Sequence, residues 1–154
     1  MIKLNKAERK LAYYIARKRY ESARSAGVVN SRMGPQSNEQ TDLEGIAAEV
    51  AFCKAFNIYP DLEIDSVSFP DFDCVLSDGR SVDVKATRYE SGRLIAAKWK
   101  KPESVDLYAL MVGVFPEYRF AGVMQSIDLI NPERLCQMPK GKAYAASQNE
   151  LESI

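Results

Sequence analysis

Apolar residues recur every three or four positions near the start of the chain, which predicts two helices. The first is expected over residues 3–26. The second is expected to begin at Thr41, which has capping-box spacing to Glu44, and to end near Asn57. The segment between them, 27–40, is rich in Ser and Asn, contains Gly and Pro, and is expected to form a loop.

From about Leu62 the apolar positions alternate every two residues, which is typical of half-buried strands. Strands are expected over 62–67, 71–76, 81–87, 94–98, 105–114 and 118–124, with a short segment at 126–130 and a further strand at 142–146 before a final helical turn. Two helices followed by mostly antiparallel strands predict a mixed α/β fold in a single domain of 154 residues.

Composition narrows the class of protein. Hydrophobic residues make up 46% and charged residues 27%, the balance of a folded soluble protein. No apolar run approaches the roughly 20 residues of a membrane-spanning helix, and the N-terminus has no apolar signal core. We therefore expect a cytoplasmic protein that does not bind membranes. Three widely spaced cysteines without a CxxC pair argue against a disulfide scaffold or a zinc thiolate site.

The chain contains no histidine, which excludes Ser-His and Cys-His triads and histidine-ligated metals. An active site would have to use carboxylates, lysine, arginine, tyrosine or hydroxyls. A catalytic metal would have oxygen ligands, which favours magnesium, manganese or calcium.

Charge is unevenly distributed although the net charge is zero. Residues 1–35 carry nine Lys or Arg and two Glu. Because the net charge is zero, the remaining residues carry an equal excess of Asp and Glu over Lys and Arg. A basic arm of this kind is either a solvated helix face or a nucleic-acid-binding surface. Trp99, between two lysines, is either a packing residue or a platform that stacks on a base. The candidate nucleic-acid-binding residues are Lys3, Lys6, Lys10, Arg17 and Arg24 near the N-terminus, and Arg88, Lys98 and Lys100 further along.

Residues 70–87 are predicted to form a β-hairpin with Ser77-Asp78-Gly79 as a three-residue loop. That loop pairs Leu76 with Arg80 and, counting back, Asp73 with Asp83. A two-residue loop would instead place Cys74 opposite Asp83. The apolar face of the hairpin is expected to consist of Phe72, Cys74, Leu76, Val82, Val84 and Ala86, and the polar face of Asp71, Asp73, Asp83, Lys85 and Thr87.

Carboxylates this close repel one another unless a cation lies between them or one is protonated. A hard divalent cation is the simplest explanation. The alternative is a solvated surface hairpin with structural charge pairs, although like charges directly opposite are unfavourable in a sheet.

Pro70-Asp71, followed after eleven residues by Asp83-Val84-Lys85, resembles the signature of the PD-(D/E)xK, or restriction-endonuclease-like, nuclease superfamily. That superfamily includes type II restriction enzymes, Holliday-junction resolvases and phage exonucleases. The resemblance covers roughly residues 41–130 and implies a catalytic core with a central mixed β-sheet flanked by helices. Residues 1–40 would then be an added basic helix and loop, and 131–154 a C-terminal extension. The resemblance suggests a small phage or mobile-element member.

The resemblance implies a role for each matching residue. Asp83 would bind metal, and Lys85 would orient or help deprotonate the attacking water and steady charge on the phosphate. Glu49 matches the carboxylate of the preceding helix, with Glu44 as its rival. The first carboxylate of the motif is either Asp71 or Asp73. Asp71 directly follows Pro70, as the Pro-Asp motif requires, whereas Asp73 faces Asp83 in the predicted hairpin. One or two Mg²⁺ (or Mn²⁺) ions would be held by these aspartates, with Glu49 and the Val84 carbonyl as further ligands.

The implied function is a metal-dependent nuclease, with DNA preferred to RNA and endonucleolytic cutting preferred. A homodimer would supply the second site that two cuts in a duplex need. The first alternative is a catalytically inactive nucleic-acid-binding or structural protein of the same fold. A second is a small protein–protein adaptor, whose function would not depend on Lys85.

Overall fold

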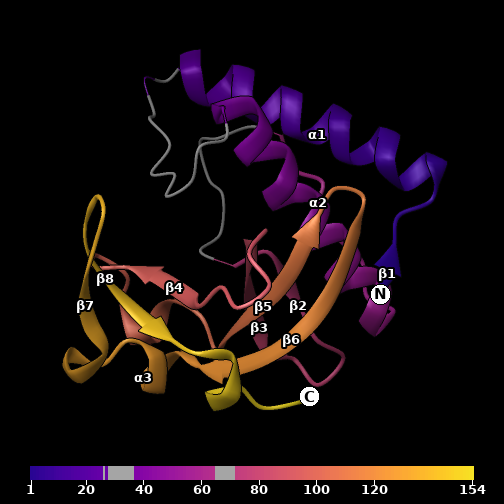
Figure 1. Cartoon of the computed structure of the whole chain (residues 1–154). Helices are drawn as coiled ribbons and strands as arrows, with labels where there is room; N and C mark the ends of the chain where they lie inside the picture. Colours follow the sequence, from indigo (N-terminus) through magenta and orange to yellow (C-terminus); the bar gives the residue numbers. More distant parts are fainter. Residues whose placement is uncertain (26, 28–36, 65–71) are drawn as a thin grey trace.

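The computed structural model describes residues 1–25, 27, 37–64 and 72–154, which form two long helices, a short third helix and two β-sheets (Figure 1). The helices are α1 (Lys6–Ser25) and α2 (Asn38–Phe56). They lie side by side at the top of Figure 1, with α2 between α1 and the larger sheet. None of the helices in these described ranges has both the length and the apolar character needed to cross a membrane.

Helix α1 begins three residues later than the sequence pattern suggests. The Asn5 side chain accepts a hydrogen bond from Glu8 N–H, and the Glu8 carboxylate accepts one from Asn5 N–H. This reciprocal pair is a capping box and fixes the start of the helix. Lys3 therefore lies outside the helix and belongs to a short strand, β1 (Ile2–Lys3).

Helix α2 begins at Asn38, one turn earlier than expected. Ser37 is its N-cap, and the Ser37 hydroxyl accepts from Gln40 N–H. The predicted capping box of Thr41 and Glu44 is therefore wrong, because Thr41 lies inside the helix and donates its hydroxyl to the Ser37 carbonyl. The expected end is confirmed by Asn57, which adopts the left-handed conformation that commonly ends helices.

The larger sheet is mixed and has five strands in the order β1-β6-β5-β3-β2. Its strands beyond β1 are β2 (Cys74–Val75), β3 (Ser81–Thr87), β5 (Leu107–Val114) and β6 (Glu117–Gln125). Strands β3 and β5 are parallel, and the other pairs are antiparallel. A mixed α/β architecture, as expected from the sequence, is thus confirmed.

The predicted hairpin has the expected register. Cys74 pairs with Val82, and Leu76 N–H donates to the Arg80 carbonyl. The first strand is shorter than the predicted 71–76, because regular pairing begins only at Cys74.

A second sheet of three strands lies beside the first, in the order β4-β8-β7. These strands are β4 (Leu94–Ala97), β7 (Leu135–Met138) and β8 (Gly141–Ala146), and the short helix α3 (Ser126–Leu129) precedes β7. Because β8 pairs with β4, the expected C-terminal extension, 131–154, contributes to the second sheet. Strand β7 was not predicted. Residues 62–64 are not a strand, and the rest of the strand expected at 62–67 lies outside the described residues.

Apolar side chains fill both faces of the larger sheet. Strand β5 is buried on both, which explains its continuous apolar sequence. On the α2 face the core includes Phe52, Val82 and Val84, and on the other face it includes Leu94 and Tyr108. Asp83 and Lys85 alternate with Val82 and Val84 along β3, so their side chains leave the sheet on the face opposite α2.

Two members of the predicted apolar face of the hairpin depart from it. Phe72 packs against the second core cluster rather than with Cys74 and Leu76, and Ala86 is exposed. Regular alternation holds only within the paired part of the strands.

Candidate functional site

Strand β3 places a buried aspartate against two lysines. Asp83 is 4% exposed, and its Oδ1 lies 2.7 Å from Lys85 Nζ. Its Oδ2 lies 3.5 Å from the Nζ of Lys100, which comes from the turn after β4. A buried carboxylate is tolerated only when charge and hydrogen bonding compensate for lost hydration, and the two ammonium groups supply that compensation here.

Asp73 lies where regular pairing between β2 and β3 ends. Its backbone N–H donates to the Val82 carbonyl at 2.8 Å, and its Oδ2 accepts from Val84 N–H at 2.6 Å. If the regular register continued, Phe72 would stand opposite Val84 and its backbone carbonyl would accept from Val84 N–H. The Asp73 carboxylate accepts that hydrogen bond instead. The N–H and C=O of one strand residue point toward the same neighbour, so the Val84 carbonyl is directed to this edge too.

The Asp73 carboxylate interacts electrostatically with that of Asp83. Burial first and the negative charge of Asp83 second raise the pKa of Asp73 to about 6, although Lys85 and the Val84 N–H act in the opposite direction. The observed strand pairs are Cys74–Val82 and Val75–Ser81, and Asp73 itself donates to Val82, so the predicted pairing of Asp73 with Asp83 is not among them; the two carboxylates nevertheless interact through their charges.

Glu49 joins this group from helix α2. Its side chain is 15% exposed, and its Oε2 lies 3.5 Å from Arg19 Nη1. Burial raises the pKa of Glu49 well above its ordinary value, the charges of Asp73 and Asp83 raise it further, and Arg19 opposes them. Glu49 thus interacts with the hairpin carboxylates although it lies on a different element.

The structure brings together four of the predicted site residues: Glu49, Asp73, Asp83 and Lys85. The rival Glu44 is buried at another position along α2. There, burial and the Glu44 carboxylate raise the pKa of Tyr118, and the Tyr118 hydroxyl donates to the backbone carbonyl of Glu44. Asp71 lies outside the described residues. Within the described part of the chain, no group of three or more Asp, Glu, Cys or His has metal-site geometry.

Arg19 is a site residue that the sequence pattern did not single out. Its guanidinium contacts Glu49 and donates to the backbone carbonyls of Asp61 and Glu63 at 3.1 and 2.8 Å. Its position in the sequence could have indicated that it faces the core. Arg19 follows Ile15 by four residues and Ala16 by three, so it lies on the buried face of α1. It joins α1, α2 and the segment after α2 around the site.

Three of the predicted nucleic-acid-binding residues have described partners outside the carboxylate cluster. Lys3 pairs with Glu117 at 3.0 Å, Arg17 pairs with Glu21 at 3.2 Å, and the Arg24 guanidinium lies over the Tyr20 ring. Lys6, Lys10 and Lys98 are exposed and Arg88 is half-buried. Of these candidates, Lys100 is the one with a described contact to the carboxylates.

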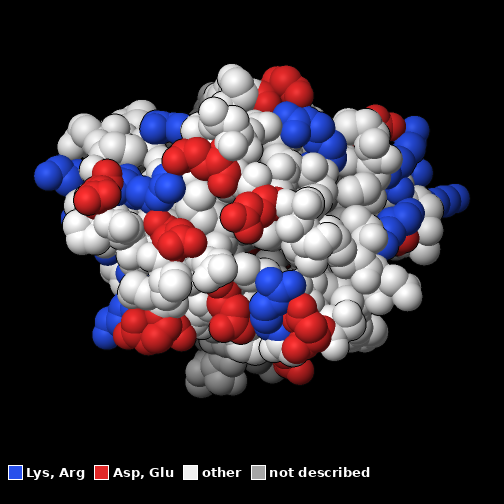
Figure 2. All heavy atoms as spheres, turned by 90° about the horizontal axis from the view of Figure 1, so that it is seen from below, with Lys and Arg blue, Asp and Glu red and all other residues white. Residues whose placement is uncertain are grey.

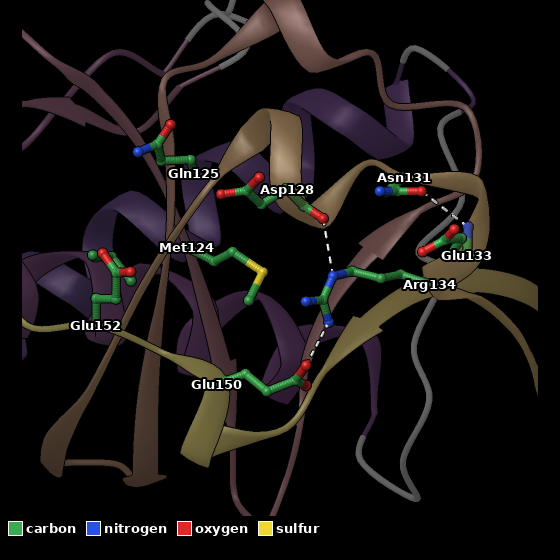
Figure 3. Close-up of a pocket in the computed structure, with 9 residues that line it drawn as sticks. Met124, Gln125, Asp128, Asn131, Glu133, Arg134, Glu150 and Glu152 are labelled. Carbon is green, nitrogen blue, oxygen red and sulfur yellow. Dashed lines mark hydrogen bonds and ion pairs between the residues drawn. The ribbon is translucent and has the colours of Figure 1, made fainter.

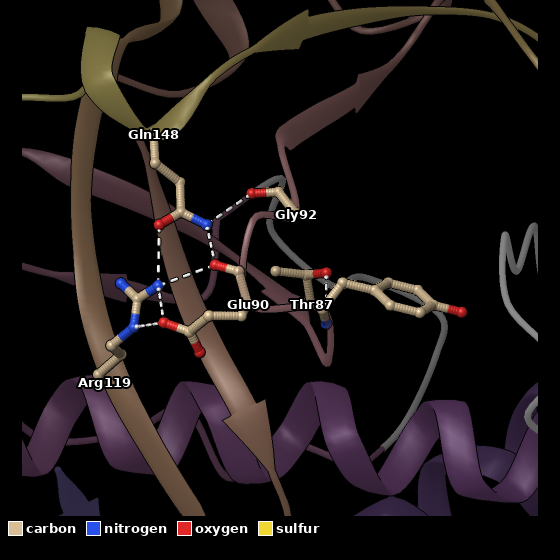
Figure 4. Close-up of polar contacts among 6 residues, drawn as sticks. Thr87, Glu90, Gly92, Arg119 and Gln148 are labelled. Atoms are coloured by element: carbon tan, nitrogen blue, oxygen red, sulfur yellow. Dashed lines mark hydrogen bonds and ion pairs between the residues drawn. The ribbon is translucent and has the colours of Figure 1, made fainter.

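The loop that follows β3 is held in place by a polar network (Figure 4). Arg119 on β6 donates to the carboxylate and the backbone carbonyl of Glu90 and to the Gln148 side chain. Gln148 in turn donates to the carbonyls of Glu90 and Gly92 at 2.8 Å. The network fixes the path from Lys85 to β4 and so helps to place Lys100.

Two hollows lie on the surface. One, of about 720 Å³, lies beside Asp73 and is lined by residues 59–64 and 72–75. The other, of about 470 Å³, lies between the end of β6, α3 and the C-terminal segment, and four acidic side chains line it (Figure 3). Arg134 in this second hollow is bound to Glu150 and to the Asp128 carbonyl.

The acidic hollow contains none of the predicted site residues. In Figure 2, acidic side chains gather near the middle of the lower face, and most basic ones lie toward its sides. The hollow beside Asp73 is acidic as well, since Asp61, Glu63 and Asp73 line it, so charge does not distinguish the two hollows.

Comparison with known proteins gives a family but not an activity. No curated protein matches the chain. Residues 2–133 match a family model described as a family of unknown function, DUF5843. The matched region contains both long helices, the five-stranded sheet and the four clustered residues. The chain therefore belongs to the DUF5843 family of unknown function.

Proposed function

We propose that the chain is a metal-dependent nuclease that hydrolyses phosphodiester bonds in DNA. One observation carries the proposal: Asp83 and Lys85 lie 2.7 Å apart on β3, and Asp73 and Glu49 lie near enough to them for burial and repulsion between carboxylates to raise the pKa of Glu49 and Asp73. Crowded, dehydrated carboxylates are common where a protein binds a cation or transfers a proton.

The fold supports the same proposal at a coarser level. A mixed sheet has helix α2 on one face, and an antiparallel hairpin leads into a strand that is parallel to its next neighbour. We propose that this is a restriction-endonuclease-like core. A homodimer would supply a second site for cutting both strands of a duplex.

The residues present fit a hard divalent cation. Asp73 and Asp83 would hold Mg²⁺ or Mn²⁺ with the Val84 carbonyl, and all three supply the oxygen atoms that these ions prefer. The raised pKa of Asp73 fits as well, because negative charge is under-compensated at its carboxylate. When bound, the ion would polarise the phosphodiester and acidify a water molecule.

Lys85 and Glu49 would then have different tasks. Burial by itself would lower the pKa of Lys85, but Asp83 at 2.7 Å, together with Asp73 and Glu49, outweighs burial and the pKa is raised. Lys85 therefore remains a cation and would stabilise negative charge on the phosphate rather than accept a proton. Glu49, whose pKa is raised well above its ordinary value, is the carboxyl suited to hold a proton.

A second candidate function has its own supporting observation. Every member of the cluster has a partner within the protein: Asp83 has two lysines, Asp73 has the Val84 N–H, and Glu49 has Arg19. A nucleic-acid-binding or structural protein that kept this fold without catalysis would show such satisfied pairs.

Metal titration separates the two candidates. We would titrate Mg²⁺ and Mn²⁺ into the protein by calorimetry, beside Asp73→Asn and Asp83→Asn. The matched control is Asp78→Asn, because Asp78 lies in the hairpin turn and pairs with Arg80 away from the cluster. The nuclease proposal expects binding by the wild type and Asp78→Asn and its loss in the other two. Absence of binding in the folded wild type would contradict the nuclease and favour the second candidate.

A further inference from the structure

The turn after β4 presents an exposed tryptophan beside the candidate site. Lys100 N–H donates to the Ala97 carbonyl at 3.0 Å, which closes a turn with Trp99 near its tip. Trp99 is 65% exposed and is the single tryptophan of the chain. The next residue, Lys100, contacts Asp83. The backbone of Trp99 is therefore one residue away from Lys100, which contacts Asp83 of the carboxylate cluster.

The stretch of sequence that contains Trp99 is basic. Residues 85–101 contain six Lys or Arg and one Glu. Lys98 and Lys101, on either side of the tip, are exposed. Exposed ammonium groups attract a phosphate backbone, and their contribution does not depend on sequence.

A single exposed apolar residue is ordinary on a protein surface. Trp99 differs because its backbone is fixed by the turn and by the contact of the next residue with Asp83. Aromatic rings combined with lysines that follow a backbone are the means by which proteins bind single strands, since every base has a face that can stack. In a regular duplex the base faces are already stacked on one another and are closed to an indole.

We propose that the Trp99 turn binds an unpaired nucleotide next to the phosphate that is cut. The indole stacks on the base while Lys98 and Lys101 contact the flanking phosphates. This inference rests on the proposed nuclease function and names its substrate class: DNA with unpaired bases, such as a single strand, a flap or a branch.

Trp99 itself reports on the interaction, because no other tryptophan contributes to the fluorescence. In EDTA, where the proposed cleavage cannot occur, we would titrate the protein with a single-stranded oligonucleotide, a blunt duplex of the same sequence and a single-stranded RNA. The single strand of DNA is expected to quench the fluorescence to saturation, at lower concentrations than the duplex. Equal quenching by the duplex would overturn the preference for unpaired bases. Stronger quenching by the RNA would overturn the assignment to DNA.

Variants measured by anisotropy of a labelled single strand complete the test. Trp99→Ala is expected to weaken binding by about 5- to 150-fold, as loss of one stacked base does, and Trp99→Phe should retain most of the affinity. Ile127→Ala is the matched control, because Ile127 is exposed to the same degree, 64%, on helix α3. It should keep both the quenching and the affinity.

Failure of this inference is distinguishable from failure of the nuclease proposal. Wild-type fluorescence that does not respond to any single strand, or unchanged affinity in Trp99→Ala, would overturn the binding site. Metal-dependent cleavage accompanied by a silent Trp99 would refute the stacking site alone. Quenching and stacking without any cleavage would support the site and contradict the nuclease.

Discussion

Replacing Asp73 by Asn is expected to stabilise the folded protein at neutral pH in the absence of divalent metal. The pKa of Asp73 is raised from its ordinary value of 3.8 to about 6, chiefly by burial and next by Asp83. The folded protein therefore holds this proton over a pH range in which the unfolded chain has released it. The free energy of unfolding must then fall as the pH rises from about 4 to about 6.

The size of the effect follows from the shift in pKa. A shift of about two pH units corresponds to about 3 kcal/mol, which is the upper limit for what neutralisation can recover. Asn removes the charge but keeps an oxygen to accept the hydrogen bond from Val84 N–H. At pH 7.5 the variant should therefore unfold up to about 6–12 °C above the wild type, and near pH 4 the two should nearly coincide.

The assay is thermal unfolding followed by circular dichroism between pH 4 and pH 8 in EDTA. Asp78→Asn is the control, since the Asp78 carboxylate is exposed and the pKa of Asp78 is lowered by its hydrogen bond to Arg80. That control should gain no stability at pH 7.5. A wild type whose stability does not fall relative to Asp73→Asn as pH rises would refute the reasoning, as would a less stable Asp73→Asn at pH 7.5.

Three further predictions concern the surroundings of the site. Arg119→Ala should lower the free energy of unfolding by about 1–3 kcal/mol in urea, because it removes the guanidinium that joins β6 to the loop after β3; an unchanged urea midpoint would argue against the network. Gly92→Ala should cost about 1–3 kcal/mol, because the added Cβ would lie 2.2 Å from Thr87 Oγ1; a variant as stable as the wild type would show that the loop adapts. Of the three cysteines, Cys136 is partly exposed and the other two are buried, so Ellman's reagent should modify one thiol quickly and two only after unfolding; rapid modification of all three would contradict the packing.

Local sequence signals predicted those parts of the fold that depend on local interactions. The turn at Gly79 and the alternation of apolar residues fixed the register of the hairpin, and β3 was predicted with its observed bounds. Asp83 and Lys85 followed from that register. Helix starts were predicted less well because several residues near each start can act as caps. Ser37 rather than Thr41 begins α2, and Asn5 begins α1.

Features that depend on distant segments could not be predicted from local patterns. The contact between Lys100 and Asp83 joins residues 17 positions apart, across a change of sheet. Arg19 reaches carbonyls more than 40 positions away. The pairing of β8 with β4 is similarly non-local, so the C-terminal segment was expected to be an extension. The helical period predicts that Arg19 lies on a buried face of its helix, but it does not predict which carboxylate Arg19 will contact.

We propose that the cluster of Glu49, Asp73, Asp83 and Lys85 cuts DNA with the help of a divalent metal. Supercoiled plasmid incubated with the protein in Mg²⁺, Mn²⁺ or EDTA tests it most directly, beside folded Asp83→Ala and Lys85→Ala variants. We expect nicking or linearisation that requires the metal and is lost in both variants. Failure of the wild type to cut plasmid, single strands, branched DNA or RNA in either metal would contradict the claim.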